Sequence, residues 1–209
     1  MNFQPVITAP NLGFDWLLHG FGLRDSIPPA DLTTAQQVHS ARVLDACGRK
    51  GERIGEGDAI VSAEPGVMIG VRTADCVPIL IADPANRVVA CVHAGWRGTA
   101  ANIVQATIDA LRQRGSRAPQ LCVAIGPSIG ACCYEVGPDV ARQFDKWSRA
   151  EGSMGLDLPA INEAQFREEG VVNIWKSGEC TYCLPERFFS FRRDRENAGR
   201  MLSFVSRIA

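Results

Sequence analysis

The chain has 209 residues, of which 46% are hydrophobic and 22% charged, and its formal net charge is −1 at pH 7. This composition is typical of a globular protein and excludes a disordered or fibrous chain. The balanced charge argues against a nucleic-acid partner, which usually selects a basic excess, and no apolar run is long enough to span a membrane.

The eight cysteines are expected to be reduced thiols. The first ten residues, MNFQPVITAP, contain neither the basic nor the apolar region of a secretory signal peptide, which predicts a cytoplasmic protein. Thiols stay reduced in that compartment and are available for metal binding or chemistry. Only three histidines accompany them, His19, His39 and His93, and this small number limits every metal hypothesis.

Four apolar runs of strand length, each bounded by turn residues, predict β-strands. Their apolarity is continuous rather than alternating, which predicts that both faces of these strands are covered. The runs are residues 67–71, 77–82, 88–92 and 121–125.

Three segments predict helices. Residues 100–114 carry apolar side chains on one face, with Thr99 as N-cap and Gly115 just beyond the C-terminus. Residues 138–150 and 159–169 each begin at a proline, which favours the first helical position. The remaining chain, 171–208, is predicted to be mainly extended.

Strands and helices do not alternate strictly along the chain, which favours an α+β fold over a doubly wound sheet. We expect one domain over residues 1–209, with mixed or antiparallel sheets packed with flanking helices. A weak boundary near 151–157 does not require a second domain.

A hairpin is predicted to join Cys76 to His93. Asp83-Pro84-Ala85-Asn86 has the residue types of a type I turn and lies between two apolar runs. A turn centred between Pro84 and Ala85 places Cys76 opposite His93, with Cβ atoms about 4.5–5.5 Å apart, close enough to share a metal ion. A longer loop would shift this register by one or two residues. The hairpin alone leaves open whether the pair binds metal or is a buried cysteine beside a hydrogen-bonded histidine.

A glycine-rich turn at residues 95–99 leads from the second hairpin strand into the first predicted helix. The N-terminus of a helix attracts anions, and the guanidinium of Arg97 can bind phosphate through two hydrogen bonds. The alternative is a tight turn in which Arg97 points into water. The turn lacks the Gly-Lys-Ser/Thr ending of a Walker A loop.

These residues, in this order, resemble the YfiH-like laccase-domain family, also called the multicopper polyphenol oxidase family, some members of which are described as purine nucleoside phosphorylases. The tandem of TADC and HAGWRG is highly specific, and the matching stretches extend over most of the chain. They are HGFGLR (19–24), QVHSARV (37–43), GDAIVS (57–62), TADCVPILIADP (73–84), VHAGWRGTAANIV (92–104), AIGPSIGACCYEVG (124–137) and CTYCLPERFFSFRRD (180–194).

The resemblance implies a zinc-type metal, with copper as the alternative ion, held by His39, Cys76 and His93. Three protein ligands and a fourth position left to water are typical of a catalytic zinc. The resemblance also implies phosphorolysis of adenosine, inosine and methylthioadenosine to free base and ribose 1-phosphate, together with adenosine deamination, so the partners are a purine nucleoside and phosphate. Cys76 and His93 would then act with Arg97, which binds phosphate. Asp75, adjacent to Cys76 in the sequence, is the candidate for proton transfer; the alternative is that its side chain points to the opposite face of the strand and only supports the turn.

The chain departs from the family in its N-terminal part, where only residues 25–36 separate HGFGLR from QVHS. This segment is shorter than is usual in the family, and Leu23 and Ser40 replace the common threonine and glycine. We expect these changes to spare the metal ligands and to alter the wall of the substrate pocket.

Three other functions are consistent with these residues. The first is a copper-dependent polyphenol oxidase, although three histidines cannot supply the imidazoles of a multicopper cluster. The second is a hydrolase that acts in peptidoglycan-precursor editing, with Cys76 as nucleophile and His93 as its base. The third is a metal-binding or sensing module without turnover.

Two further clusters are assigned to structure rather than function. Cys180 and Cys183 form CTYC, and Cys132 and Cys133 could complete a four-cysteine metal site with them, but adjacent cysteines are poor zinc-ligand spacing and structural packing is favoured. A basic cluster near the C-terminus is predicted to be solvated surface. It consists of Arg192, Arg193 and Arg195.

Overall fold

Two mixed sheets of six strands each form the centre of the structure, a computed structural model that describes residues 5–147 and 155–208. In order across the first sheet, the strands are β1 (Val6–Ile7), β2 (Leu17–Gly22), β12 (Met201–Arg207), β7 (Met68–Thr73), β3 (Leu32–Gln36) and β5 (Arg53–Glu56). In order across the second sheet, they are β11 (Asn173–Lys176), β10 (Cys122–Ile125), β8 (Val77–Asp83), β9 (Val88–Ala94), β6 (Ala59–Ser62) and β4 (Val43–Asp45).

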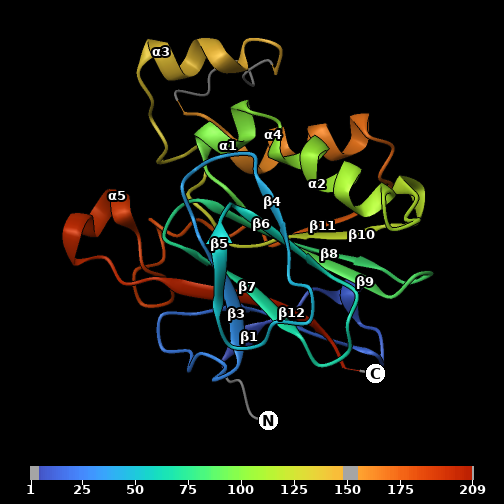
Figure 1. Cartoon of the computed structure of the whole chain (residues 1–209). Helices are drawn as coiled ribbons and strands as arrows, with labels where there is room; N and C mark the ends of the chain where they lie inside the picture. Colours follow the sequence, from blue (N-terminus) through green and yellow to red (C-terminus); the bar gives the residue numbers. More distant parts are fainter. Residues whose placement is uncertain (1–4, 148–154, 209) are drawn as a thin grey trace.

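Helices cover the outer face of the second sheet, which gives three layers in Figure 1. The α-helices are α1 (Trp96–Ala100), α2 (Ile103–Arg112), α3 (Pro138–Ala141), α4 (Leu158–Glu168) and α5 (Phe191–Asp194). Short 3-10 turns lie at Pro10–Leu12, Ala118–Gln120, Arg142–Phe144 and Arg195–Asn197. None of the helices in the described ranges has the length and apolarity that a membrane crossing requires.

The second sheet has a core on each face, because successive side chains of a strand point in opposite directions. From β8, Ile79 and Ile81 belong to the apolar cluster that includes Phe166 of α4. Leu80 points the other way, into the cluster that includes Val205 of β12. Every residue of β8 and β9 is buried, as their continuous apolarity predicts.

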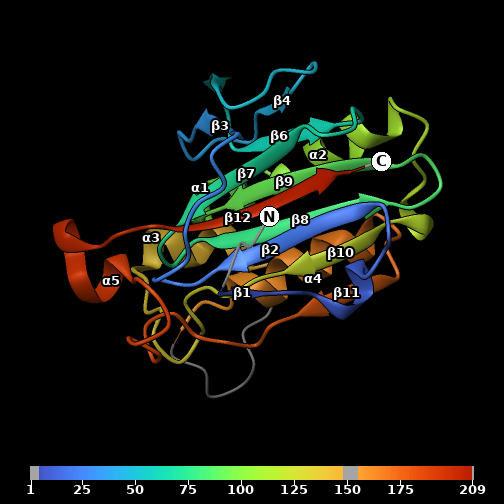
Figure 2. The ribbon, with the colours of Figure 1, turned by 90° about the horizontal axis from the view of Figure 1, so that it is seen from below.

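The predicted α+β class and all four predicted strands are confirmed, as β7, β8, β9 and β10. The sheets are mixed because antiparallel pairs such as β8–β9 stand beside parallel pairs such as β3–β7. Figure 2 shows β12, near the C-terminus, lying inside the first sheet. It pairs antiparallel with both β2 and β7, so the two ends of the chain close one sheet.

The helix predicted over residues 100–114 begins earlier and is broken. The chain turns into α1 directly after Gly95, and Asn102, with φ of 58°, separates α1 from α2. The predicted N-cap at Thr99 is therefore wrong, because this residue is buried inside α1. Gly115 does adopt the left-handed φ of 83° expected just beyond a helix end.

The other two helix predictions differ in how far they hold. The helix predicted over 159–169 is present as α4, and the Asp157 side chain caps it by accepting from the Ala160 amide. The segment predicted over 138–150 forms α3 and then a 3-10 turn, and its residues 148–150 lie outside the described residues. Most of the weak domain boundary predicted at 151–157 also lies outside the described residues. The predicted extended C-terminal part contains β11 and β12 but also α5, which its pattern did not predict.

Candidate active site

Three potential metal ligands converge where several strands of the two sheets begin or end. His39 follows β3, Cys76 directly precedes β8, and His93 lies near the end of β9. Their ligating nitrogen and sulfur atoms all lie within 4.8 Å of one another. The two imidazole rings meet edge to face, with centroids 4.9 Å apart. A set of two imidazoles and one thiolate fits a zinc or copper ion.

The hairpin brings Cys76 to His93 in a register that differs from the predicted one. His93 pairs with Pro78, because four residues rather than two separate Asp83 from Val88. Direct opposition of Cys76 and His93 is therefore wrong by two residues. A shift of two preserves the side-chain face, so both side chains still reach the same site.

Gly95 allows the ligands to approach one another. A Cβ atom at this position would lie 3.0 Å from Cys76 Sγ and 3.1 Å from His39 Cδ2. These contacts are tighter than packed atoms normally allow, so a residue without a side chain is needed beside the metal ligands.

Asp58, just before β6, links two of the three ligands. Its carboxylate accepts a 2.8 Å hydrogen bond from His93 Nδ1, which leaves Nε2 of that ring available as a ligand. The same carboxylate accepts from the backbone amides of His39 and Ser40 at 3.0 and 2.7 Å. Asp58 was not among the predicted site residues, although it lies in the stretch GDAIVS, directly before an apolar strand.

The electrostatics of this group favour ionised ligands. Burial raises the pKa of the Cys76 thiol, but hydrogen bonds with His39 and His93 outweigh burial and lower it to about 6. Burial likewise disfavours the charged form of Asp58, yet hydrogen bonds from His93 and Ser40 lower the pKa of its carboxyl to about 2. Metal binding requires the thiolate form of a cysteine, and this arrangement provides it near neutral pH.

The three ligands line a cavity of about 690 Å³ that is rich in arginine. Asp75 is the one acidic residue among the described residues that line it. The arginines on its wall are Arg53, Arg72, Arg97, Arg192, Arg195 and Arg200. Arg192 and Arg195 thus belong to the cavity wall, and Arg195 is solvent-exposed, as predicted for this cluster. Arg193 instead donates to the carbonyl oxygens of Thr181 and Phe188.

Arg97 lies in the wall of this cavity, with its guanidinium carbon 4.2 Å from the centre of the Trp96 ring. Arg97 is solvent-exposed as well as part of the cavity wall, so its role as a phosphate ligand stays a prediction. The predicted helix terminus at Ala100 is absent, because this residue ends α1. Arg97 itself, rather than that helix end, is therefore the group available to an anion.

Asp75 is held in a strained backbone conformation, with φ of 85°. Its carboxylate accepts hydrogen bonds from Thr181 Oγ1 at 2.7 Å and from the Arg192 amide at 2.6 Å. His39 and Arg195, which also line the cavity, have φ of 59° and 53°. Such conformations cost energy in non-glycine residues and occur preferentially at functional sites.

His19 lies outside the metal-ligand group. It is buried in β2, where its Nε2 accepts from the Ala9 amide at 2.9 Å, and burial lowers its pKa. The site thus has two imidazoles, although the chain contains three histidines.

Comparison with known proteins places this geometry in a family. A family model described as multi-copper polyphenol oxidoreductase laccase matches residues 23–208. A purine nucleoside phosphorylase of Deinococcus radiodurans is 39% identical over 181 residues, which cover 84% of this chain and 70% of the relative. Adenosine deaminase RL5, from an unknown prokaryotic organism, is 38% identical over 197 residues, covering 85% of this chain and 75% of the relative.

Solved structures share the whole architecture. YlmD from Geobacillus stearothermophilus superimposes with a TM-score of 0.87 at 28% identity, over 99% of each chain. The hypothetical protein YfiH from Bacillus licheniformis gives a TM-score of 0.82 at 27% identity, over 92% of this chain and 94% of that one. The YfiH-like fold implied by the sequence motifs is thereby confirmed.

Proposed function

The chain is an enzyme that belongs to the multi-copper polyphenol oxidoreductase laccase family, and on this premise we propose that it is a zinc-dependent purine nucleoside phosphorylase with adenosine deaminase activity. Its substrates are adenosine and inosine, which it cleaves with phosphate to the free base and ribose 1-phosphate, and methylthioadenosine, which it cleaves to adenine and 5-methylthioribose 1-phosphate. One observation carries the proposal: His39, Cys76 and His93 converge on the wall of an arginine-rich cavity.

The donor set supports zinc over a copper cluster. Its two imidazoles and one thiolate suit a single ion, and a cluster of several copper ions needs more imidazoles than this chain contains. A zinc ion bound there supplies Lewis-acid chemistry at the cavity wall. Asp58 fixes the His93 ring and the backbone of His39, so the ligands are oriented before any ion binds.

Arg97 is assigned to phosphate. Phosphorolysis joins a phosphate oxygen to C1′ of the ribose as the bond from C1′ to the purine nitrogen breaks, and positive charge develops at C1′. A planar guanidinium can hold the phosphate through two hydrogen bonds. The stack on Trp96 restricts the Arg97 side chain, so less of its freedom is lost when phosphate binds.

Asp75 is assigned to proton transfer. Its carboxylate already accepts from Thr181 and from the Arg192 amide, which fixes its orientation within the cavity wall. Deamination adds water to the purine ring and releases ammonia, so a proton must move from the water to the leaving nitrogen. An oriented carboxylate can accept that proton and return it.

Aromatic side chains on the cavity wall suit a purine. Trp96, Tyr134 and Phe191 all line the cavity, and flat apolar rings provide the surface against which a base stacks. The cavity wall carries both polar and aromatic side chains, and this combination favours a substrate with a planar base and a polar sugar.

The direct test is metal analysis combined with incubation on adenosine, with and without phosphate. We expect the protein to contain bound zinc. From adenosine, adenine and ribose 1-phosphate should form only when phosphate is present, whereas inosine should form with or without phosphate. Hypoxanthine should then form from inosine when phosphate is supplied. A zinc-loaded protein that converts no nucleoside would contradict the proposal.

Chelation separates this proposal from the Cys–His hydrolase. Removal of the metal should abolish nucleoside turnover, and added zinc should restore it. A pair in which Cys76 is the nucleophile and His93 its base would keep its activity, or gain some, in the chelated protein.

A further inference from the structure

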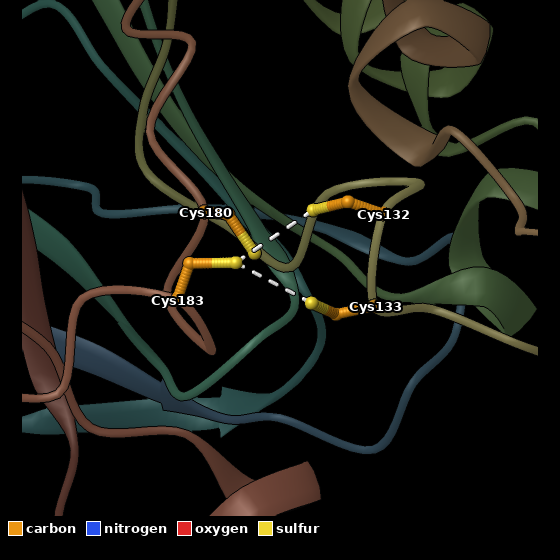
Figure 3. Close-up of side chains that lie close together, drawn as sticks. All are labelled: Cys132, Cys133, Cys180 and Cys183. Atoms are coloured by element: carbon orange, nitrogen blue, oxygen red, sulfur yellow. Dashed lines mark hydrogen bonds between the residues drawn. The ribbon is translucent and has the colours of Figure 1, made fainter.

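Four cysteines from two loops gather at one edge of the second sheet (Figure 3). β10 and β11 are parallel neighbours, so the chain leaves both strands at the same edge. Cys132 and Cys133 lie in the loop after β10, and Cys180 and Cys183 lie in the loop after β11. The topology therefore brings together residues that are about fifty positions apart in the sequence.

The four sulfur atoms are spaced as ligands of one ion. All lie within 4.8 Å of one another, with Cys183 Sγ 3.8 Å from Cys132 Sγ and 3.4 Å from Cys133 Sγ. Zinc bound to four thiolates at about 2.3 Å in a tetrahedron separates the sulfurs by about 3.8 Å. A disulfide would require a sulfur–sulfur distance of about 2.05 Å, and all four thiols are free.

Packing does not account for this cluster. Cys132 and Cys183 are exposed, whereas a cysteine that serves as a small hydrophobic residue is normally buried. Cys91, in the core between the sheets, shows that buried environment in the same chain. One cysteine of each pair is therefore exposed and the other half-buried, so the predicted structural packing does not explain Cys132 and Cys183.

Adjacent cysteines can both reach the centre because the backbone turns tightly before them. The amide of Cys133 donates to the Gly130 carbonyl at 3.0 Å, and both sulfurs of the pair point toward the CTYC loop in Figure 3. The Gly130 amide in turn donates to Cys180 Sγ at 3.3 Å. Backbone donors to sulfur stabilise the thiolate form that a metal ligand needs.

We propose that Cys132, Cys133, Cys180 and Cys183 bind one Zn²⁺ in a closed tetrathiolate site, distinct from the group formed by His39, Cys76 and His93. All four positions of the ion are filled by protein, as in structural zinc sites, and no position is left for a substrate.

The ion would link the loop after β10 to the loop after β11, and both loops contribute to the cavity. Tyr134, next to Cys133, lines the cavity. Thr181, between the cysteines of CTYC, donates to the Asp75 carboxylate, and its amide donates to the Ser128 carbonyl at 3.0 Å. The four-cysteine site therefore positions residues of the cavity without contacting a substrate.

Zinc content in matched variants tests the site. We expect Cys133→Ser and Cys183→Ser to contain one zinc ion per chain fewer than the unmodified protein, measured by elemental analysis after exhaustive dialysis. Cys47→Ser is the matched control, because Cys47 is an exposed free thiol outside both ligand groups, and it should lose none. Cys76→Ala should retain the ion of the four-cysteine site, so failure of the proposed function does not decide this test.

Cobalt gives a second readout that does not depend on the serine variants folding. Cys76→Ala protein produced in medium supplied with cobalt should show the strong near-ultraviolet charge-transfer band and the visible bands of a tetrahedral tetrathiolate. Absence of these bands, or zinc content unchanged in both serine variants, would overturn the proposal. A mass and thiol count that reveal a disulfide among the four cysteines would overturn it as well.

Discussion

Gly95 and Gly137 occupy equivalent local positions with very different surroundings. Each precedes a helix with an extended backbone, at φ of −77° and −68°. A Cβ at Gly95 would meet Cys76 Sγ at 3.0 Å, whereas a Cβ at Gly137 would meet no atom within 4 Å. The pair isolates the effect of crowding the metal ligands from the effect of removing a glycine before a helix.

Gly95→Ala should weaken zinc binding at the His39–Cys76–His93 group about tenfold, the low end of what disturbing the surroundings of metal ligands costs. The added methyl group must displace Cys76 or His39 by a few tenths of an ångström. Competition with a chromogenic chelator measures the affinity, in a Cys183→Ser background that removes the second zinc. Equal affinities for Gly95→Ala and Gly137→Ala would contradict this role of Gly95.

Arg97→Ala should retain zinc and lose phosphorolysis in preference to deamination, because only the former needs a bound phosphate. Hydrogen bonds to a charged group contribute about 1.5–3 kcal/mol, so the loss of this pair should lower kcat/KM for phosphate about 10–100-fold. Arg97→Lys should recover only part of it, since an ammonium cannot bind both oxygens through a fixed fork.

The readout for Arg97 is the ratio of adenine to inosine formed from adenosine at fixed phosphate. Arg87→Ala serves as a control, because Arg87 lies in the hairpin loop and is not among the residues that line the cavity. Equal losses in both activities would show that Arg97 does not act through phosphate.

Local spacing predicted that Cys76 and His93 meet, and the family resemblance added His39, but neither predicted the residues that support these side chains. TADC and HAGWRG are short motifs that can be recognised in the printed sequence. Asp58 acts on His93 across 35 positions, and nothing in the spacing of the two residues indicates that contact. The same limit applies to the four cysteines, whose meeting depends on β10 and β11 being parallel neighbours.

At the scale of elements, the β8–β9 hairpin shows how a small error in loop length matters. The sequence correctly predicted both strands and their covered faces, but the loop contains Pro84 to Arg87, and Arg87 adopts a left-handed φ of 51°. Register depends on such turn conformations, which residue preferences alone do not determine. The prediction that Cys76 and His93 reach the same site still held, because a shift by an even number of residues keeps both side chains on the same face.

Asp83 stabilises this turn. Its Oδ1 accepts from the amides of Ala85 and Asn86 at 2.9 and 3.2 Å, and Oδ2 accepts from the Asn86 side chain at 2.8 Å. Burial disfavours its charged form, but the nearby Ser116 hydroxyl and the hydrogen bonds from Asn86 and the turn backbone lower the pKa below the ordinary 3.8.

Asp83→Ala should lower the free energy of unfolding by about 1–3 kcal/mol at pH 7, because the turn loses its hydrogen bonds to a buried, charged acceptor. The folded-state pKa is depressed, so the stabilisation is fully present above the unfolded value of 3.8 and is lost as pH falls through the folded value. The difference between the two proteins should therefore shrink at acid pH, measured by urea unfolding at several pH values.

Asp109→Ala is the control for the hairpin variant. Asp109 pairs with Arg112 on the surface of α2, and its side chain is 52% exposed. Such pairs contribute little to stability, so a change below about 0.5 kcal/mol is expected. Comparable destabilisation in both variants would mean that the Asp83 hydrogen bonds do not stabilise the turn.

At the scale of the whole molecule, the order of strand and helix patterns along the chain predicted the α+β class but not how the sheets close. β12 lies between β2 and β7, and long-range pairing of this kind joins segments about 185 positions apart in the sequence. The cavity depends on the same closure. Arg72, on β7, lines the cavity together with Arg192 and Arg200, which come from the C-terminal part of the chain.

The distribution of charge separates the cavity from the rest of the molecule. The chain as a whole carries a formal charge of −1, yet six arginines and one aspartate line the cavity. The field that attracts an anion is therefore local, and an overall positive charge is not needed for it. Phosphate is an anion, whereas adenosine is neutral, so the two proposed reactions should respond differently to salt.

We expect kcat/KM for phosphate in phosphorolysis to fall steeply as NaCl is raised from 0.01 to 0.15 M, over which the Debye length shortens from about 30 to about 8 Å. Deamination of adenosine in the same samples should change little. Arg53→Gln combined with Arg200→Gln should flatten the salt dependence of phosphorolysis and leave deamination unchanged, because both side chains line the cavity without being assigned to either reaction. Equal salt slopes for the two reactions would mean that the arginines do not draw phosphate into the cavity.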